Sequence, residues 1–399
     1  MPDRSADHRY RMRAQVSVPK LLECGEVAHW WCTHISETMP TALVHSPHAP
    51  GGLEDAPNDA VMEIEAETDL GTLSLKDFLE HPQSGARGII VVKSGKIVVE
   101  SYPDLRADQP HLWASCAKPT AGLMIEYLID AGLIDDDGLI GDYIPALRDT
   151  EWHDVTVRQV MDMTPGMDCE ENEATRADPT SNAIRAFLAE FGHPVNGKVE
   201  TLLEVLQSSR RVGTPGEKFE YGSPCTQVLV FLAETVAGLP WAEQFRRNVW
   251  SHLRADGPFQ AHLTPDGVAL AHGVVSTTLR DMARFGMLYT PSWSRISIQQ
   301  VVSDDVIARI RGGVRDKAFF MNGYDGPVFV DRLGDDTMLG NARQWDCIWP
   351  DGDFYKGGFM DQGLYVSADR DLVIAYFSTT PNMQLTRYLR PIATSDLLA

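Results

Sequence analysis

The sequence predicts an α+β fold, in which an antiparallel sheet is flanked by helices and interrupted by an all-helical insertion. Residues 88–102 contain two β-branched runs on either side of a Ser-Gly pair, which is the pattern of a β-hairpin. Further strand-like runs lie at about 353–359, 362–368 and 372–378. The long segment between these two regions is largely apolar at helical spacing. Strands at both ends with helices between them indicate one sheet built from both ends of the chain.

Helical periodicity marks six segments of the middle region. The expected helices are 117–132, 181–191, 199–207, 226–238, 242–253 and 273–289. The last of them is expected to begin with Ser276 or Thr277 as its N-cap. The final stretch, 383–399, is predicted to be helical apart from Pro391.

These elements predict how the chain is divided into domains. Residues 71–118 and 268–399 are expected to form an α/β domain, and 119–267 a helical domain. The active site is predicted at their interface. Residues 1–70 are polar, with Pro, His and acidic clusters, and are interpreted as an irregular N-terminal extension.

Composition and charge exclude several classes of function. The 399 residues are 43% hydrophobic and 23% charged, so the chain can bury a full core without disulfides or metal. The net charge of -21 argues against a nucleic-acid partner and against an anionic membrane surface. The six cysteines form no C-x-x-C pair and are interpreted as reduced thiols of a cytoplasmic protein. No secretory signal is visible, and because no run of about 18 apolar residues exists, no transmembrane helix is expected.

One short motif with catalytic potential, S-x-x-K, occurs twice, at Ser17–Lys20 and at Ser115–Lys118. Pro19 is expected to disrupt a helix that would present the first pair on one face. Ser115 instead follows the hairpin and stands at the start of an apolar helix, where the i, i+3 spacing puts both side chains on one face. The helix N-terminus would also favour a developing oxyanion. A serine N-cap followed by a surface lysine is the competing interpretation.

Two further motifs follow in the chain. Tyr221, in a Tyr-Gly-Ser sequence, lies after a Pro-Gly turn and before a long apolar helix, which predicts a loop position facing a cleft. A buried tyrosine with a satisfied hydroxyl is the alternative. Lys356-Gly357-Gly358 lies on a predicted C-terminal strand.

Taken in order, SCAK (115–118), PGEKFEYGS (215–223), GVVSTTLRDMARFG (273–286) and YKGGFMDQGLYVSADRDLVIAYFS (355–378) resemble the serine β-lactamase and penicillin-binding-protein superfamily. The sequence is most similar to the 6-aminohexanoate-dimer (nylon-oligomer) hydrolases and related carboxylesterases. The resemblance covers roughly residues 85–380 and implies a β-lactamase-like fold.

The resemblance also implies roles for individual residues. Ser115 would be the nucleophile, Lys118 its proton acceptor, and Tyr221 the relay of the proton to the leaving group. The backbone N–H groups of Ser115 and Phe359 would form the oxyanion hole. Lys356 is a candidate for the positive charge that lowers the pKa of Lys118.

The substrate cleft is expected to include Lys356, Gly357, Gly358 and His272. For His272, capping of the next helix is an equally good interpretation. Gly357 stands where β-lactamases have Thr or Ser, and Ser223 where many relatives have Asn, which argues against β-lactam turnover and leaves simpler amides and esters.

Aromatic and acidic residues give weaker predictions. Trp345 is expected to wall an apolar acyl pocket, with core packing as good an explanation. Asp168, Glu170 and Glu171 form an acidic segment that could meet a substrate ammonium group, although a solvated loop is favoured.

The function predicted from these observations is a cytoplasmic serine hydrolase that cleaves small amides or esters through an acyl-enzyme, without a cofactor or metal. The alternatives are acyl transfer to another acceptor, then a DD-peptidase or β-lactamase, then a non-catalytic ligand-binding relative. A small-molecule substrate is the expected partner. The assembly is left open, with a homodimer as one option.

Overall fold

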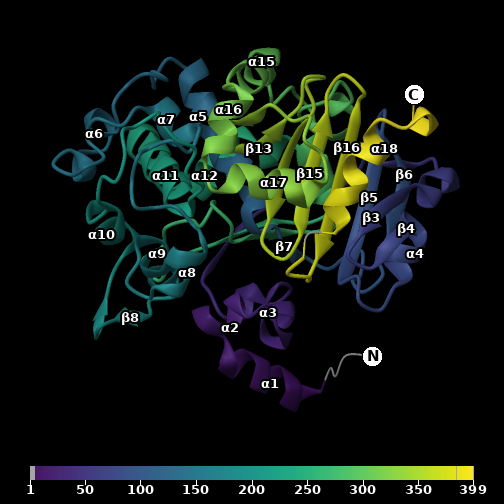
Figure 1. Ribbon diagram of the computed structural model, residues 1–399, viewed down its shortest axis with the longest axis horizontal. Helices are drawn as coiled ribbons and strands as arrows, with labels where there is room; N and C mark the ends of the chain where they lie inside the picture. Colours follow the sequence, from purple (N-terminus) through teal and green to yellow (C-terminus); the bar gives the residue numbers. More distant parts are fainter. Residues whose placement is uncertain (1–4, 383, 399) are drawn as a thin grey trace.

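An eight-stranded sheet forms the centre of the computed structural model, which describes residues 5–382 and 384–398 (Figure 1). In spatial order its strands are β12 (Gly340–Ala342), β13 (Trp345–Ile348), β14 (Phe354–Gly358), β15 (Gln362–Ser367), β16 (Leu372–Ser378), β5 (Ala86–Lys93), β6 (Lys96–Ser101) and β2 (Glu54–Asp55). All neighbours are antiparallel except β2 and β6. The pairing of β16 with β5 joins the C-terminal strands to the predicted hairpin, so the α+β prediction is confirmed.

The hairpin β5–β6 follows directly from its sequence. Ser94 and Gly95 both have positive φ angles, 51° and 71°, which is what a tight two-residue turn between right-twisted strands requires. Helix α13 (Leu279–Met287) packs on β5, β15 and β16. A Cβ at Gly286 would come within 2.7 Å of Val373, so the small residue allows this close approach.

Helices supply most of the regular secondary structure between the hairpin and residue 259, and they lie to the left of the sheet in Figure 1. They are α5 (Lys118–Asp130), α6 (Ile140–Tyr143), α7 (Val157–Met161), α8 (Glu173–Ala177), α9 (Asn182–Glu190), α10 (Leu202–Gln207), α11 (Ser223–Ala237) and α12 (Trp241–Asn248). The apolar helices α5 and α11 pack against each other. Residues 119–267 are not all-helical as predicted, because they also contain a two-stranded ribbon, β8 (Pro194–Val195) with β9 (Lys198–Val199), and the strand β10 (Phe259–His262).

A second sheet has four strands from distant parts of the chain. Its order is β1 (Thr41–Val44), β10, β11 (Val275–Thr277) and β7 (His111–Leu112). Strand β11 corrects one prediction: α13 begins after Thr278 as its N-cap, not after Ser276 or Thr277, because those two residues pair in the sheet instead.

The N-terminal extension is not irregular, so that prediction is wrong for the described residues; positions 1–4 lie outside them. It contains α1 (Ala6–Gln15), α2 (Val18–Leu22) and α3 (Glu26–Trp31), which form a small lobe below the main body in Figure 1, and β3 (Glu65–Thr68), which pairs with β4 (Gly71–Ser74). Trp31, Cys32 and Ile35 are buried against the body. Scattered apolar residues of this kind form a core only when they pack against residues from elsewhere in the chain. The polar composition of the segment does not reveal such packing.

Short helices complete the molecule. They are α4 (Leu75–Glu80), α14 (Trp293–Ile296), α15 (Asp304–Gly312), α16 (Lys317–Asn322), α17 (Asp325–Leu333) and α18 (Leu389–Ala393). Pro391 lies inside α18 rather than interrupting the helical stretch, while positions 383 and 399 lie outside the described residues. In the described chain no single helix is long and apolar enough to cross a bilayer, and only the pair Ser223–Ala237 and Trp241–His252, bent by 76°, passes that test together.

Candidate active site

Ser115 lies in a cavity of about 390 Å³, on the 3₁₀ turn Ala114–Ala117 that leads into α5. The residue before it, Ala114, has a φ of 47°. This left-handed conformation costs a non-glycine residue about 1–2 kcal/mol, so the surrounding structure must hold it in place. The backbone N–H of Trp113 bonds the Val275 carbonyl at 2.9 Å, which fixes the turn to β11. A strained turn that presents a serine to a cavity is typical of a functional position.

Lys118 is fully buried beside this turn. Its Nζ donates to the Ser223 hydroxyl at 2.9 Å and to the His272 carbonyl at 2.8 Å. Burial lowers the pKa of Lys118 to about 8, with Lys356 acting in the same direction and Glu171 opposing both. The surface-lysine interpretation is therefore wrong. A lysine with this pKa is partly neutral near pH 7–8 and can accept a proton.

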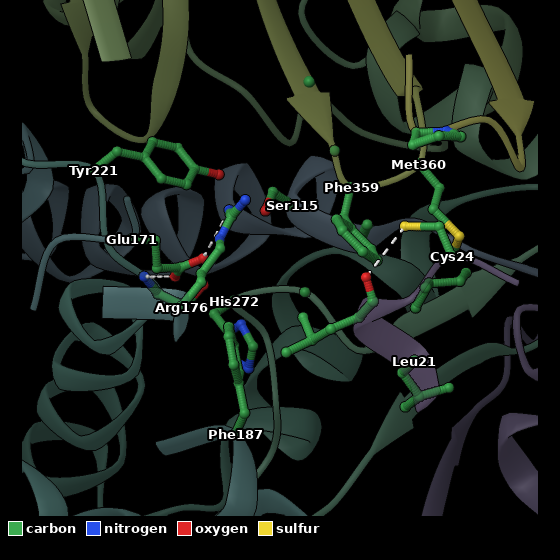
Figure 2. A pocket seen from close by; sticks show the side chains of 18 of the residues that line it. Leu21, Cys24, Ser115, Glu171, Arg176, Phe187, Tyr221, His272, Phe359 and Met360 are labelled. Atoms are coloured by element: carbon green, nitrogen blue, oxygen red, sulfur yellow. Dashed lines mark hydrogen bonds and ion pairs between the residues drawn. The ribbon is translucent and has the colours of Figure 1, made fainter. Parts of the chain in front are cut away.

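The Tyr221 hydroxyl links Ser115 to a second buried lysine. It accepts a hydrogen bond from Lys356 Nζ at 3.0 Å and shares another with the Ser115 side chain, toward which it points in Figure 2. Lys356 is held by Asp346 at 2.7 Å. Burial, reinforced by Asp346, raises the pKa of Tyr221 well above its usual value, so the phenol stays protonated. Tyr221 precedes Gly222, the N-cap of α11, as the loop prediction required.

The end of strand β14 lies directly against the turn that carries Ser115. A Cβ on Gly358 would be only 2.8 Å from the Trp113 carbonyl and 3.0 Å from Ala114, so a larger residue would push the strand away. Phe359, which follows, lines the cavity together with Gly357 and Gly358, whereas Lys356, also expected in the substrate cleft, is fully buried and does not line it. The N–H of Gly357 donates to Asp346 at 3.0 Å, which ties the strand to the Lys356 pair.

His272 lines the cavity and does not cap the next helix, since Thr278 does so. Its Nε2 lies 2.8 Å from a carboxylate oxygen of Glu190, and both side chains are buried. The contact is at ion-pair distance but outside hydrogen-bond angles. The His272 carbonyl also holds Lys118, so this residue serves the site through its backbone as well.

Trp345 is not a pocket residue, and that prediction is corrected. Its side chain is only 2% exposed and packs edge-on against Tyr289 and Phe354 at centroid distances of 5.4 and 4.6 Å. The alternative of core packing is the correct one, because strand β13 is buried along its whole length.

The acidic segment divides into residues with different surroundings. Asp168 accepts from the Arg210 N–H at 2.9 Å, and Glu170 pairs with Lys218 at 3.0 Å. Glu171 is buried and lines the cavity, so the solvated-loop interpretation is wrong for it. Its carboxylate accepts from the Ser223 N–H at 2.6 Å.

Sequence reasoning missed several residues that line the cavity. Asp325 at the start of α17 and Arg176 in α8 both face it, and helix α2 contributes Leu21 and Leu22. Figure 2 shows Leu21 and Cys24 on the side opposite Tyr221. None of these positions belongs to a recognisable motif, because they reach the site only through the tertiary fold. Within residues 5–382 and 384–398, no group of three His, Cys, Asp or Glu side chains is arranged to hold a metal ion.

A serine on a strained turn, a buried lysine of lowered pKa and a protonated tyrosine lie together at one site, and these are residue types that serine hydrolases use. The chain belongs to the Beta-lactamase family, whose model matches residues 75–395. It is 27% identical to the 6-aminohexanoate-dimer hydrolase of Paenarthrobacter ureafaciens over 395 residues, which cover 96% of this chain and 94% of that protein.

Solved structures show the same fold. A Bacillus anthracis protein provisionally described as a 6-aminohexanoate-dimer hydrolase superposes with a TM-score of 0.77 at 22% identity, over 92% of each chain. EstCE1, described as a hydrolase with promiscuous acyltransferase activity, gives a TM-score of 0.55 at 14% identity, over 78% of this chain and 93% of that one. These likenesses confirm the predicted family, the β-lactamase-like fold and the class of serine hydrolase.

Proposed function

We propose that the protein hydrolyses small linear amides or esters through an acyl-enzyme on Ser115. The observation that carries this proposal is Lys118, which is fully buried, has a pKa of about 8 and lies next to the Ser115 turn. A serine hydroxyl is a weak nucleophile until a base removes its proton, and a lysine can be that base only when its pKa is lowered.

In the proposed reaction Lys118 takes the Ser115 proton, directly or through the Tyr221 hydroxyl that bonds Ser115. The Ser115 oxygen attacks the substrate carbonyl carbon, and the N–H groups of Ser115 and Phe359 receive the resulting oxyanion. The C–N or C–O bond then breaks as Tyr221 protonates the leaving amine or alcohol, and the ammonium of Lys118 restores the tyrosine proton. In the second half of the cycle water attacks the carbonyl carbon of the ester and gives a proton to neutral Lys118. The bond from that carbon to the Ser115 oxygen then breaks, the acid is released, and the Ser115 oxygen takes the proton back from Lys118.

The walls of the cavity suit a linear substrate with a positively charged end. The residues that line it include the acids Glu173 and Asp325 as well as Leu21, Leu22 and Phe359. The matched relative is named for a dimer of 6-aminohexanoate, a linear amide that carries an amine. We therefore infer amides of short amino acids as the first substrates to test. Gly357, in the place of the Thr or Ser of β-lactamases, favours such substrates over β-lactams.

A cytoplasmic location and the absence of a nucleic-acid partner belong to the same proposal. All six cysteines are free, as expected where thiols are kept reduced, and five of them are buried. The net charge of -21 disfavours binding to phosphate backbones.

The test is covalent labelling of the intact protein with a fluorophosphonate, followed by peptide mass spectrometry. We expect one adduct, on the peptide that contains Ser115, and a loss of at least about a thousand-fold in p-nitrophenyl ester turnover in Ser115→Ala. Ser17→Ala is the matched control and should be labelled and turn over like the wild type. Normal turnover by Ser115→Ala would refute the proposal.

A further inference from the structure

Glu171 occupies a position between the proposed base and the start of helix α11. Its side chain is buried, and its carboxylate accepts from the Ser223 N–H at 2.6 Å. Its own N–H donates to the Tyr221 carbonyl at 2.8 Å. The residue therefore holds the backbone on both sides of Gly222. Contact between the two segments is tight here, since a Cβ on Gly222 would be 2.3 Å from the Cys169 carbonyl.

The same carboxylate is separated from the lysine by one hydroxyl group. Ser223 Oγ accepts from Lys118 Nζ at 2.9 Å and also shares a hydrogen bond with Glu171. A carboxylate at this position stabilises the ammonium form of Lys118 in a site where burial disfavours charge. When Lys118 takes the proton of Ser115, it becomes such an ammonium.

We propose that Glu171 is a positioning residue that sets the proton affinity of Lys118 and fixes Tyr221 and Ser223 at the start of α11. This inference rests on the function proposed above, and it assigns to the acidic segment a role inside the site. Without the carboxylate, Lys118 would be a weaker base and the ammonium formed during acylation would lack its counter-charge.

Several other charged or titratable groups face Lys118 and Glu171. Lys118 faces the charges of Glu171, Lys356 and Asp346, the Cys225 thiol, and the Tyr221 ring at 5.3 Å. Glu171 faces Lys118, Arg176 at 3.7 Å, and Asp325. Although burial works against its charge, Lys118 and Arg176 hold the pKa of Glu171 below its usual value, so it is a carboxylate at neutral pH.

The test is the pH dependence of the rate at which a fluorophosphonate phosphonylates Ser115, because this reaction reports the first half of the cycle alone. In the wild type the rate should rise with pH around a midpoint of about 8, as Lys118 loses its proton. In Glu171→Gln the midpoint should move down by about one pH unit, because the loss of the negative charge favours neutral lysine. The plateau rate should fall as well, since a weaker base removes the serine proton less effectively.

Two further variants of the same segment, Glu170→Gln and Arg176→Gln, test whether the shift in midpoint is specific to Glu171. Glu170→Gln removes the neighbouring carboxylate, which pairs with Lys218 instead, and should leave the midpoint in place. Arg176→Gln removes an exposed positive charge near Glu171 and should move the midpoint upward, opposite to Glu171→Gln. It also tests the proposal if Glu171→Gln does not fold.

An unchanged midpoint in folded Glu171→Gln, with only a lower rate, would mean that Glu171 supports the structure alone and would overturn the proposal. An unchanged or lowered midpoint in Arg176→Gln would do the same. Failure of the proposed function looks different: phosphonylation would then persist in Ser115→Ala, or the wild-type rate would not titrate near pH 8.

Discussion

The chain contains the same four-residue pattern twice, and the two copies have opposite surroundings. Ser17 stands at the N-cap position of the five-residue helix α2 without a capping hydrogen bond from its side chain, and Lys20 is 46% exposed and pairs with Glu23 at 2.8 Å. Lys118 is fully buried, and its ammonium group is held by a hydroxyl and a carbonyl from elsewhere in the chain. An exposed pair of this kind contributes little to stability, whereas burial lowers the pKa of Lys118, as the proposed role of a base requires.

Proline does not explain the difference between the two copies, which corrects the reason given for dismissing the first. Pro19 lies in the first turn of α2 just as Pro119 lies in the first turn of α5, so both prolines are compatible with a helix start. Helix α2 even lines the cavity, through Leu21 and Leu22. The distinction lies in the partners of the lysine, which for Lys118 are more than 100 residues away in sequence.

Replacement of each lysine should give the largest difference in activity between the two copies of the motif. We expect Lys118→Met to lower kcat/KM for p-nitrophenyl esters by about 10²–10⁴, the usual contribution of a general base, while Lys20→Met stays within about two-fold of the wild type. The wild-type kcat/KM should rise with pH around 8, because only neutral Lys118 can accept a proton. Steady-state kinetics from pH 6 to 10 measures both effects. Similar losses in the two variants would contradict the distinction.

The comparison also shows which parts of the molecule can be predicted from sequence. The hairpin β5–β6 and the strands β14–β16 follow from local β-branched runs and their turns, and α5 and α11 follow from apolar periodicity, so these elements were predictable. Ser115, Lys118 and Tyr221, the proposed catalytic residues, can be singled out from sequence because they belong to motifs whose order along the chain carries information.

The other residues of the site have no local signature. Glu171 looks like one acid among several, and only the position of α11 makes it a buried neighbour of Lys118. Trp345 shows the opposite case, since an aromatic residue near a motif was expected in the pocket and lies in the core instead. Burial at such positions is decided by contacts between distant segments, which composition and periodicity do not contain.

Tyr221→Phe should distinguish the role of the proposed base, Lys118, from that of the proposed proton donor to the leaving group. An amine leaves only when protonated, whereas a p-nitrophenolate leaves unprotonated, so we expect a loss of about 10²–10³ in amide cleavage and about ten-fold in ester cleavage. Tyr289→Phe is the matched control, because Tyr289 is a fully buried tyrosine that does not line this cavity. Equal losses on both substrates would show that Tyr221 does not deliver this proton.

The smallest effect is expected at Asp325, which lines the Ser115 cavity from a segment even further along the chain. This side chain is 9% exposed, and its Oδ2 has no hydrogen-bond partner among the described residues. Burial, together with the nearby Glu171, raises the pKa of Asp325 to about 7. Asp325 therefore gains negative charge as the pH rises through 7, and a positively charged substrate end should bind better above that pH.

We accordingly expect KM for an amide with a terminal ammonium group to fall several-fold between pH 6 and 8 in the wild type, and KM for its neutral analogue to stay constant. Asp325→Asn should raise KM for the charged amide several-fold and remove this pH dependence. Asp331→Asn, on the exposed face of the same helix α17, should leave both KM values unchanged. If KM for the charged amide and KM for the neutral amide change alike in Asp325→Asn, then Asp325 contributes to the shape of the cavity but does not bind the charged end of the substrate.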